Sequence, residues 1–324
     1  MSSQAINAIV LGGISALIPT GLYLFLVWWF DRYEKEPLHL IGAALFWGSI
    51  PAMILAALAR PALLGLSGAL FGGAMGGLWG NAILLPIAEE IAKGLFLIGL
   101  FLFYRQEIDS LYDGFLYGSL VGFAFAAADT ILSAPARNWG LIGAAERTLL
   151  LGLAHAFFTG WVGLGFAAAR LSHGGMRWAG PVLGGLVAIG LHILRNWALT
   201  YTFWNPNLAA LEAVIYWSGV LLLVGILAYG MAREGAWVAR YLADEVRDGV
   251  MPAALYETLR SPTARLAYRW GPLLQGDVGA WRRRGMQLQV AAELAFRKHQ
   301  RQALGETAVE AEIRRLREML RQLT

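Results

Sequence analysis

Residues 81–103 read NAILLPIAEEIAKGLFLIGLFLF, an apolar stretch whose ionisable residues are Glu89, Glu90 and Lys93. About 20 consecutive apolar residues allow an α-helix to cross the roughly 30 Å hydrocarbon core of a bilayer, so this stretch predicts a transmembrane helix. Ionised groups inside hydrocarbon are costly and are rare without a function. We therefore expect the two adjacent carboxylates to have a task inside the membrane.

The composition of the whole chain agrees with a membrane location. Hydrophobic residues make up 57% of the 324 residues and charged residues 15%, whereas soluble domains carry about 25% charged residues. The expected fold class is all-α, a polytopic transmembrane helical bundle of seven or eight spans. Seven apolar runs have the length of a span: 6–30, 39–59, 81–104, 112–134, 147–170, 178–201 and 209–231. An eighth, at 63–80, is so rich in glycine that it is either a span or a re-entrant, tightly packed segment.

Charge divides the chain into two parts. Residues 1–231 hold 10 Lys/Arg and 11 Asp/Glu, and residues 232–324 hold 16 and 11. We predict a transmembrane bundle over 1–231 and a basic, helical C-terminal tail over 232–324, which the positive-inside rule places in the cytoplasm. The acidic residues interspersed in the tail argue against a nucleic-acid partner. A small helical domain or an appendage on the lipid bilayer surface is the simpler interpretation of the tail.

Four ionisable residues inside the predicted spans lie at one predicted depth. Each is 15 or 16 residues from a charged residue at the presumed cytoplasmic end of its span, in the pairs Glu90 and Arg105, His155 and Arg170, His192 and Arg177, and Asp129 and Asp113. At 1.5 Å per residue this separation is about 22 Å. The sequence therefore predicts that carboxylates and imidazoles from distant helices meet at one level of the bundle.

Spacing within the helices refines this prediction. Lys93 lies three and four residues after the two glutamates, so it can neutralise one carboxylate and leave the other available. Adjacent residues point about 100° apart on a helix, so the glutamates should differ in role. His192 and Asn196 share a helix face. We expect Arg195 to face the interior and to pair with Asp129 or a glutamate.

These residues allow more than one kind of function. A buried hydrolytic site is the leading hypothesis, and the absence of cysteine excludes thiol catalysis and thiolate metal sites. Glu89, Glu90 and Lys93 could instead form a purely structural ion pair, and a single buried histidine is more often a packing residue. The alternative class is a non-enzymatic membrane protein, either a scaffold that binds helices or an ion-coupled carrier.

Five short motifs in this order resemble those of the PrsW family of membrane proteases. They are DRYEKEP at 31–37, EEIAK at 89–93, DGFLYGSLVGFAFA at 113–126, AHAFFTG at 154–160 and HILRN at 192–196. That family is in turn similar to the CAAX prenyl endopeptidases. The resemblance covers roughly residues 20–260, and it implies an intramembrane peptidase of the bacterial cell membrane that cleaves a membrane-tethered protein, for example a single-span anti-sigma factor.

The resemblance also implies roles for particular residues. Glu89 and Glu90 would carry the essential carboxylates, His155 the second motif, and His192 with Asn196 the third. Such proteins are usually described as zinc metalloproteases, and Glu90, His155 and His192 are then the expected Zn²⁺ ligands. A metal-free reaction is equally open, in which Glu90 and His155 activate water while His192 and Asn196 donate hydrogen bonds to the oxyanion.

One position departs from the family pattern. The region after the glycine-rich helix usually reads like GFAxxEN in the family, and this chain has Ala127 where the glutamate is expected. Asp129 follows two residues later, but that shift turns the side chain by about 200° around the helix. Direct replacement is therefore doubtful, and a catalytically silent homologue is the corresponding alternative.

Overall fold

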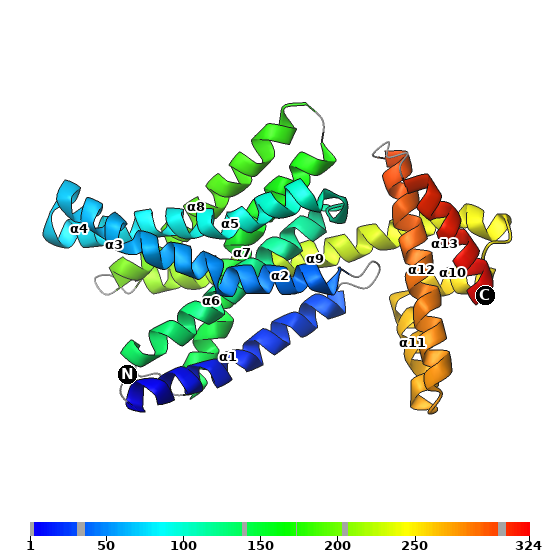
Figure 1. Ribbon diagram of the computed structural model, residues 1–324, viewed down its shortest axis with the longest axis horizontal. Coiled ribbons are helices and arrows are strands. Elements are labelled where there is room, and N and C mark those ends of the chain that lie inside the picture. The colour runs from blue at the N-terminus through cyan, green and yellow to red at the C-terminus, as the bar shows by residue number, and fades with distance from the viewer. Residues whose placement is uncertain (1–2, 31–35, 138–140, 173, 203–206, 304–308) are drawn as a thin grey trace. The chain divides into compact units, whose positions relative to one another are not determined.

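The computed structural model describes residues 3–30, 36–137, 141–172, 174–202, 207–303 and 309–324 (Figure 1). Every regular element in these ranges is a helix, which confirms the all-α prediction for the described part of the chain. The chain forms two compact units, one of residues 1–27 and 37–226 and one of residues 28–36 and 227–324. The boundary predicted after Met231 lies inside one continuous helix, α9.

The first unit is built from long apolar helices joined by short connections. Their bounds are α1 (Ser3–Phe30), α2 (Leu38–Ser49), α3 (Pro51–Phe71), α4 (Gly73–Trp79), the π-helix η1 (Gly80–Leu84), α5 (Leu85–Phe103), the 3-10 helix η2 (Arg105–Glu107), α6 (Leu111–Arg137), α7 (Leu141–Leu171), α8 (Met176–Thr202) and the first part of α9 (Asn207–Arg247).

Four stretches of the described residues are long and apolar enough to cross a membrane. They are Leu38–Phe71, Leu111–Ala134, Leu141–Leu171 and Met176–Thr200. Helix α5 differs from these because three ionisable residues, Glu89, Glu90 and Lys93, lie near its middle. The total of seven or eight spans stays a prediction.

The glycine-rich segment at 63–80 does not form one helix. Helix α3 continues through it to Phe71, and the chain then reverses at Gly72, whose φ of +73° is a conformation that favours glycine. Helix α4 packs back on α3, with the Ser67 hydroxyl donating a 2.6 Å hydrogen bond to the Gly76 carbonyl. Of the two alternatives for residues 63–80, the tightly packed segment fits better than a separate span. The span predicted at 39–59 is longer than expected, because α3 continues to Phe71.

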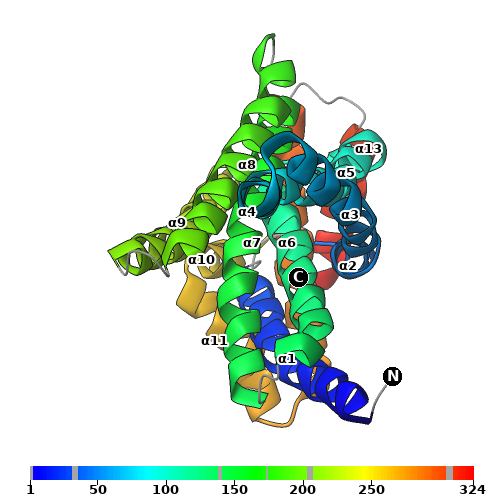
Figure 2. The same ribbon diagram turned by 90° about the vertical axis from the view of Figure 1, so that its left-hand side faces the viewer.

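Helices α6 and α7 are in backbone contact along a glycine ladder, defined as Gly114, Gly118 and Gly122. A Cβ atom built on these three glycines would lie 2.4, 2.4 and 2.1 Å from the carbonyl oxygens of Gly163, Thr159 and His155, respectively. Each glycine therefore sits where a larger residue would separate the helices. Close approach through small residues is a common way for membrane helices to associate. Figures 1 and 2 both show α6 and α7 side by side.

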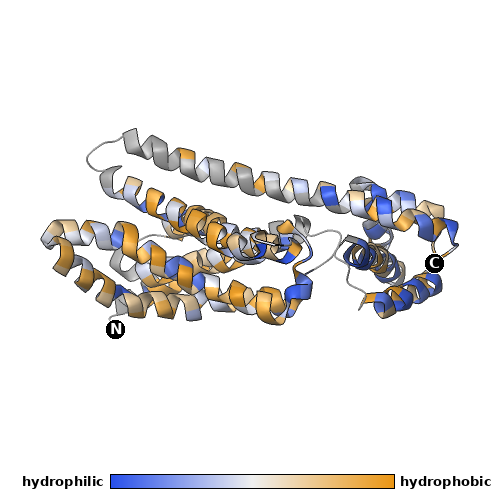
Figure 3. Ribbon diagram, turned by 90° about the horizontal axis from the view of Figure 1, so that it is seen from above, coloured by the Kyte–Doolittle hydropathy of each residue, from blue (hydrophilic) through white to orange (hydrophobic). Residues whose placement is uncertain are grey.

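The contact between α7 and α8 is equally close. A Cβ on Gly180 would lie 2.5 Å from the Gly165 carbonyl oxygen, and a Cβ on Gly184 would lie 2.3 Å from that of Trp161. Some large apolar side chains, such as Phe115 and Tyr117, are fully buried, and others, such as Leu58, are exposed on the outside of the helices. Figure 3 shows this apolar character along the helices of the first unit. The exposed large apolar side chains suit a bundle surrounded by lipid.

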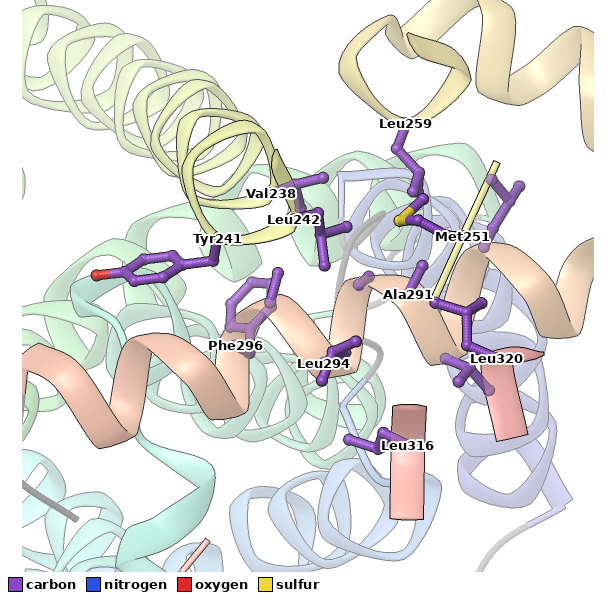
Figure 4. Packing of buried hydrophobic residues seen from close by; sticks show 14 of the residues in the cluster. Val238, Tyr241, Leu242, Met251, Leu259, Ala291, Leu294, Phe296, Leu316 and Leu320 are labelled. Atoms are coloured by element: carbon purple, nitrogen blue, oxygen red, sulfur yellow. The ribbon is translucent and has the colours of Figure 1, made fainter. Parts of the chain in front are cut away.

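The second unit contains the end of α9 together with α10 (Ala253–Arg260), α11 (Pro262–Leu274), α12 (Val278–Ala303) and α13 (Glu310–Leu323). Its core joins these helices through residues such as Leu242, Leu259, Phe296 and Leu320, each of them buried (Figure 4). The helical character expected for the tail is present in its described residues. Its cytoplasmic location stays a prediction.

Candidate active site

The helix that carries the two glutamates begins with an unusual turn. The π-helix η1 runs from Gly80 to Leu84 and leads directly into α5. A π-helical turn is rare and is frequently found near functional sites. Here the Asn81 side chain accepts a 3.1 Å hydrogen bond from Arg60 and donates a 2.7 Å bond to the Gly77 carbonyl. The turn therefore has fixed partners on α3 and α4.

Glu90 is the buried centre of the site, with 2% of its surface exposed. One carboxylate oxygen forms an ion pair with Lys93 on the same helix and lies 2.9 Å from Nδ1 of His192 on α8. The other oxygen accepts a 3.0 Å hydrogen bond from the Thr159 hydroxyl on α7. Three helices thus meet at one carboxylate.

Glu89 has a different environment, as the 100° separation of neighbouring side chains predicts. Its side chain is 20% exposed, and its Oε2 lies 3.8 Å from Nε2 of His192. The ammonium of Lys93 pairs with Glu90. Lys93 thus pairs with one of the two carboxylates, and the availability of Glu89 for chemistry stays a prediction.

Lys93 is completely buried and connects α5 to α7. Its Nζ lies 3.0 Å from Nδ1 of His155 and 4.8 Å from the centre of the Phe125 ring. A buried ammonium group needs charge compensation and hydrogen-bond partners. Glu90 supplies the charge, and His155 supplies a ring nitrogen.

Packing fixes the orientation of the two imidazole rings. The centres of the His155 and His192 rings are 4.8 Å apart, and the ring planes are 88° apart. Phe158 stacks on His192 at 5.1 Å, and Phe125 lies 5.5 Å from His155. Aromatic neighbours limit the rotation of both histidines, so their nitrogens have defined directions.

Not every predicted site residue joins this cluster. Asp129 forms an ion pair with Arg147 of α7 at 2.9 Å, rather than the predicted pair with Arg195. Arg195 donates a 3.2 Å hydrogen bond to the Asn196 side chain. Asn196 itself reaches the Asn81 carbonyl at 3.4 Å, one helical turn beyond His192. Shared depth therefore brings together Glu90 and the two histidines but leaves Asp129 outside.

The position next to Asp129 bears on the departure from the family pattern. Ala127 lies on α6, half-buried, where it offers no ligand or proton-transfer group. The ion pair of Asp129 with Arg147 directs that carboxylate to α7, so Asp129 does not replace the missing glutamate inside the cluster.

Three side chains at the site can hold a metal ion. One ligand atom from each of Glu89, His155 and His192 lies within 4.8 Å of the other two. Two imidazoles and a carboxylate form a donor set typical of catalytic zinc sites, so the residues fit a divalent ion. The geometry thus groups Glu89 with the histidines, whereas the sequence had suggested Glu90. Nδ1 of each ring already faces Glu90 or Lys93, which leaves Nε2 to face an ion.

Thr159 is a further residue of the site, for which the sequence carries only a weak signal. It follows His155 by four residues on α7, a spacing that places both side chains on one helix face. A small hydroxyl inside an apolar helix usually bonds a carbonyl of its own helix. The rotation of α5 against α7 instead brings the Thr159 hydroxyl to the Glu90 carboxylate, which a helix spacing alone does not reveal.

The fold and the site together define a membrane-embedded helical protein with carboxylates and imidazoles gathered in the interior of its bundle. The family described as "PrsW family intramembrane metalloprotease" matches residues 36–228, more than half of the chain. The chain belongs to this family, and the protein is an integral membrane peptidase. No curated protein and no solved structure matches it.

Proposed function

We propose that the protein hydrolyses a peptide bond of a membrane-tethered protein at the cluster formed by Glu89, Glu90, His155 and His192. The observation that carries this proposal is the convergence of α5, α7 and α8 on Glu90, which brings two carboxylates and two imidazoles together in a PrsW-family chain. A water molecule there has groups that can take up and return its protons.

In the proposed arrangement, Glu89, His155 and His192 hold a divalent metal ion, with zinc the expected one. The bound ion would supply Lewis acidity, which polarises a carbonyl and acidifies water. Glu90 accepts a hydrogen bond from Nδ1 of His192 and so presents its Nε2 in a fixed direction. A carboxylate behind a histidine ligand is the usual supporting contact in metal sites.

The contact of Lys93 with His155 sets a proton requirement for both versions of the chemistry, with and without a metal. When its ammonium donates to Nδ1 of His155, the neutral ring carries its proton on Nε2. An ion at Nε2 then requires one proton to leave the Lys93–His155 pair. In the metal-free version, Glu90 and His155 activate water, while His192 and Asn196 donate hydrogen bonds to the developing oxyanion. This version requires a proton-free nitrogen on His155 and a proton on Nε2 of His192, which is a different proton arrangement from the one described above.

A membrane-tethered substrate follows from the family and from the position of the cluster in apolar helices. A single-span anti-sigma factor of a bacterial cell membrane is the specific substrate that we propose by analogy. The competing hypothesis is a catalytically silent homologue that acts as a scaffold or carrier. Ala127 is the reason for this hypothesis, because the family pattern has a glutamate at that position.

The substrate test compares newly formed protein N-termini in membranes that contain the wild type or one of four variants: Glu89→Gln, Glu90→Gln, His155→Asn and His192→Asn. We expect N-termini from single-span proteins that appear with the wild type and are absent with each variant. Glu146→Gln is the control, because Glu146 is exposed on α7 and is not a member of the cluster. Equal N-termini in all samples, with every variant folded, would show that the cluster has no part in proteolysis.

The metal question is tested on purified protein by elemental analysis. We expect about one divalent ion per chain in the wild type and in His39→Asn, because His39 is exposed and outside the cluster. The ion should be lost in Glu89→Gln and His192→Asn. An active preparation without bound metal would instead support the Glu90 and His155 version.

A further inference from the structure

The C-terminal unit contains a pocket that no part of the proposed peptidase chemistry uses. Its volume is about 420 Å³, within the usual range of 300–1,000 Å³ for small-molecule sites. The charged residues that line it come from two helices, with Arg240, Asp244 and Arg247 from α9 and Lys298 and Arg301 from α12. Four cations and one anion in the lining make it a basic pocket.

The spacing of these residues follows from helix geometry. Arg240, Asp244 and Arg247 are four and three residues apart, so they lie along one face of α9. Lys298 and Arg301 are likewise three residues apart on α12. Two helix faces therefore contribute cations to the same space.

Some of this charge is already compensated. Lys298 is 4% exposed and donates hydrogen bonds to Asp244 and, at 2.6 Å, to Glu245. Arg317 forms a second ion pair with Glu245 at 2.7 Å. Arg301 pairs with Glu310 at 2.9 Å.

Two arginines remain without a carboxylate. Within the residues that the structure describes, neither Arg240 nor Arg247 forms an ion pair, and the contact of Arg240 is with the Tyr241 ring at 5.6 Å. Both are exposed at the pocket. The guanidinium groups of Arg240 and Arg247 are thus the cations of the lining that have no carboxylate partner among the described residues.

We propose that this pocket binds a phosphate-bearing anion through Arg240 and Arg247. Two guanidinium groups match the charge of a dianionic phosphate, and their planar donors suit paired contacts with its oxygens. The buried ion pairs of Lys298 hold α9 and α12 at a fixed separation, so the site exists before the ligand arrives. A soluble diphosphate and the headgroup of an anionic lipid both present this chemistry.

The test uses the full chain in a neutral, phosphate-free detergent and measures binding by calorimetry and thermal unfolding. One arm adds inorganic pyrophosphate. The other adds dioctanoyl phosphatidic acid, with dioctanoyl phosphatidylcholine as the neutral comparison. We expect saturable binding in at least one arm, and the arm that responds identifies the source of the phosphate.

Arg240→Gln combined with Arg247→Gln should weaken that binding by at least about tenfold, which corresponds to about 1.4 kcal/mol. Arg282→Gln combined with Arg283→Gln is the matched control, since it removes the same charge from exposed positions of α12 outside the pocket. Replacing Arg240 and Arg247 by lysine keeps the charge but removes the planar donors, and should weaken binding as well.

Two results would overturn the proposal. One is the absence of saturable binding in both arms. The other is an equal loss of affinity in the pocket variant and the control variant, which would show a general effect of net charge. Unfolding temperatures measured without ligand establish that the variants fold.

Discussion

At the scale of the residue, the site depends on a charge balance inside an apolar bundle. Glu90 and Lys93 are both buried and paired, and each also contacts a histidine. Removing one member of a buried ion pair leaves an uncompensated charge, which is more damaging than removing both. The pair is therefore a condition for folding as well as a part of the site.

Lys93→Met should lower the free energy of unfolding by about 3–5 kcal/mol, because it leaves the Glu90 carboxylate buried without its cation. The double variant with Glu90→Gln should recover part of this loss, since no charge is then left unpaired. Unfolding in detergent micelles measures both. A single variant as stable as the wild type would contradict the charge balance described here.

Thr159→Val should reduce proteolysis and cost about 1–2 kcal/mol of stability, because the new side chain has a similar shape but cannot donate to Glu90. The matched control is Thr148→Val on the same helix, where the buried hydroxyl bonds the Ala144 carbonyl. The measurement is cleavage of the identified substrate together with unfolding. Equal activity losses in the two variants would remove Thr159 from the site.

At the scale of the element, helix packing sets the position of His155. The glycine ladder of α6 lies against the carbonyls of α7, and Gly122 faces the His155 carbonyl itself. A side chain at this level would push α7 away from α6. The histidine would then move relative to Lys93 and Glu90.

Gly122→Ala should destabilise the bundle by about 1–3 kcal/mol through overpacking and should reduce both metal content and cleavage. Gly99→Ala provides the control, since a Cβ there meets no atom within 4 Å. Thermal unfolding and elemental analysis report the two effects. A Gly122→Ala protein with unchanged metal content would show that α7 can shift without disturbing its ligand.

Across the chain as a whole, the two units differ in how their buried charged side chains are paired. The first unit buries the Glu90–Lys93 pair beside two histidines, whereas the second builds the pairs of Glu245 with Lys298 and Arg317 into its interior. Burial alone would raise the pKa of Glu245, but the hydrogen bonds from Arg317 and Lys298 outweigh it and hold that pKa below its ordinary value of 4.5. The folded C-terminal unit therefore favours the ionised carboxylate.

This shift predicts acid sensitivity of the C-terminal unit. Because the folded pKa of Glu245 is lowered, its stabilisation is complete above about pH 4.5 and is lost as the pH falls through the folded value. Unfolding followed by circular dichroism between pH 7 and pH 3 should show this loss. Glu245→Gln should flatten the profile, and the exposed Glu257→Gln should leave it unchanged. An unaltered profile in Glu245→Gln would contradict the prediction.

The sequence predicted the helices and the common depth of Glu90, His155 and His192, because depth along a helix follows from counting residues. It did not predict the rotation of each helix about its axis. That rotation directs Asp129 toward Arg147, and it makes Glu89, rather than Glu90, the carboxylate that could share a metal ion with the two histidines.

The turn before α5 could not be predicted either. Residues 63–80 are so rich in glycine that they carry no hydrophobic periodicity, and periodicity is the main signal of secondary structure in a sequence. The reversal at Gly72 and the π-helix at 80–84 depend on contacts between α3 and α4. Local sequence leaves such contacts undetermined.

The glycine contacts on both sides of α7 also restrict the route of a substrate. Backbone touches backbone between α6 and α7 and between α7 and α8, so neither seam has room for an incoming peptide. Glu89 of α5 is the more exposed carboxylate of the cluster, with 20% of its side chain exposed. A substrate that reaches the cluster from the lipid would therefore enter beside α5 and not through either of these two helix interfaces.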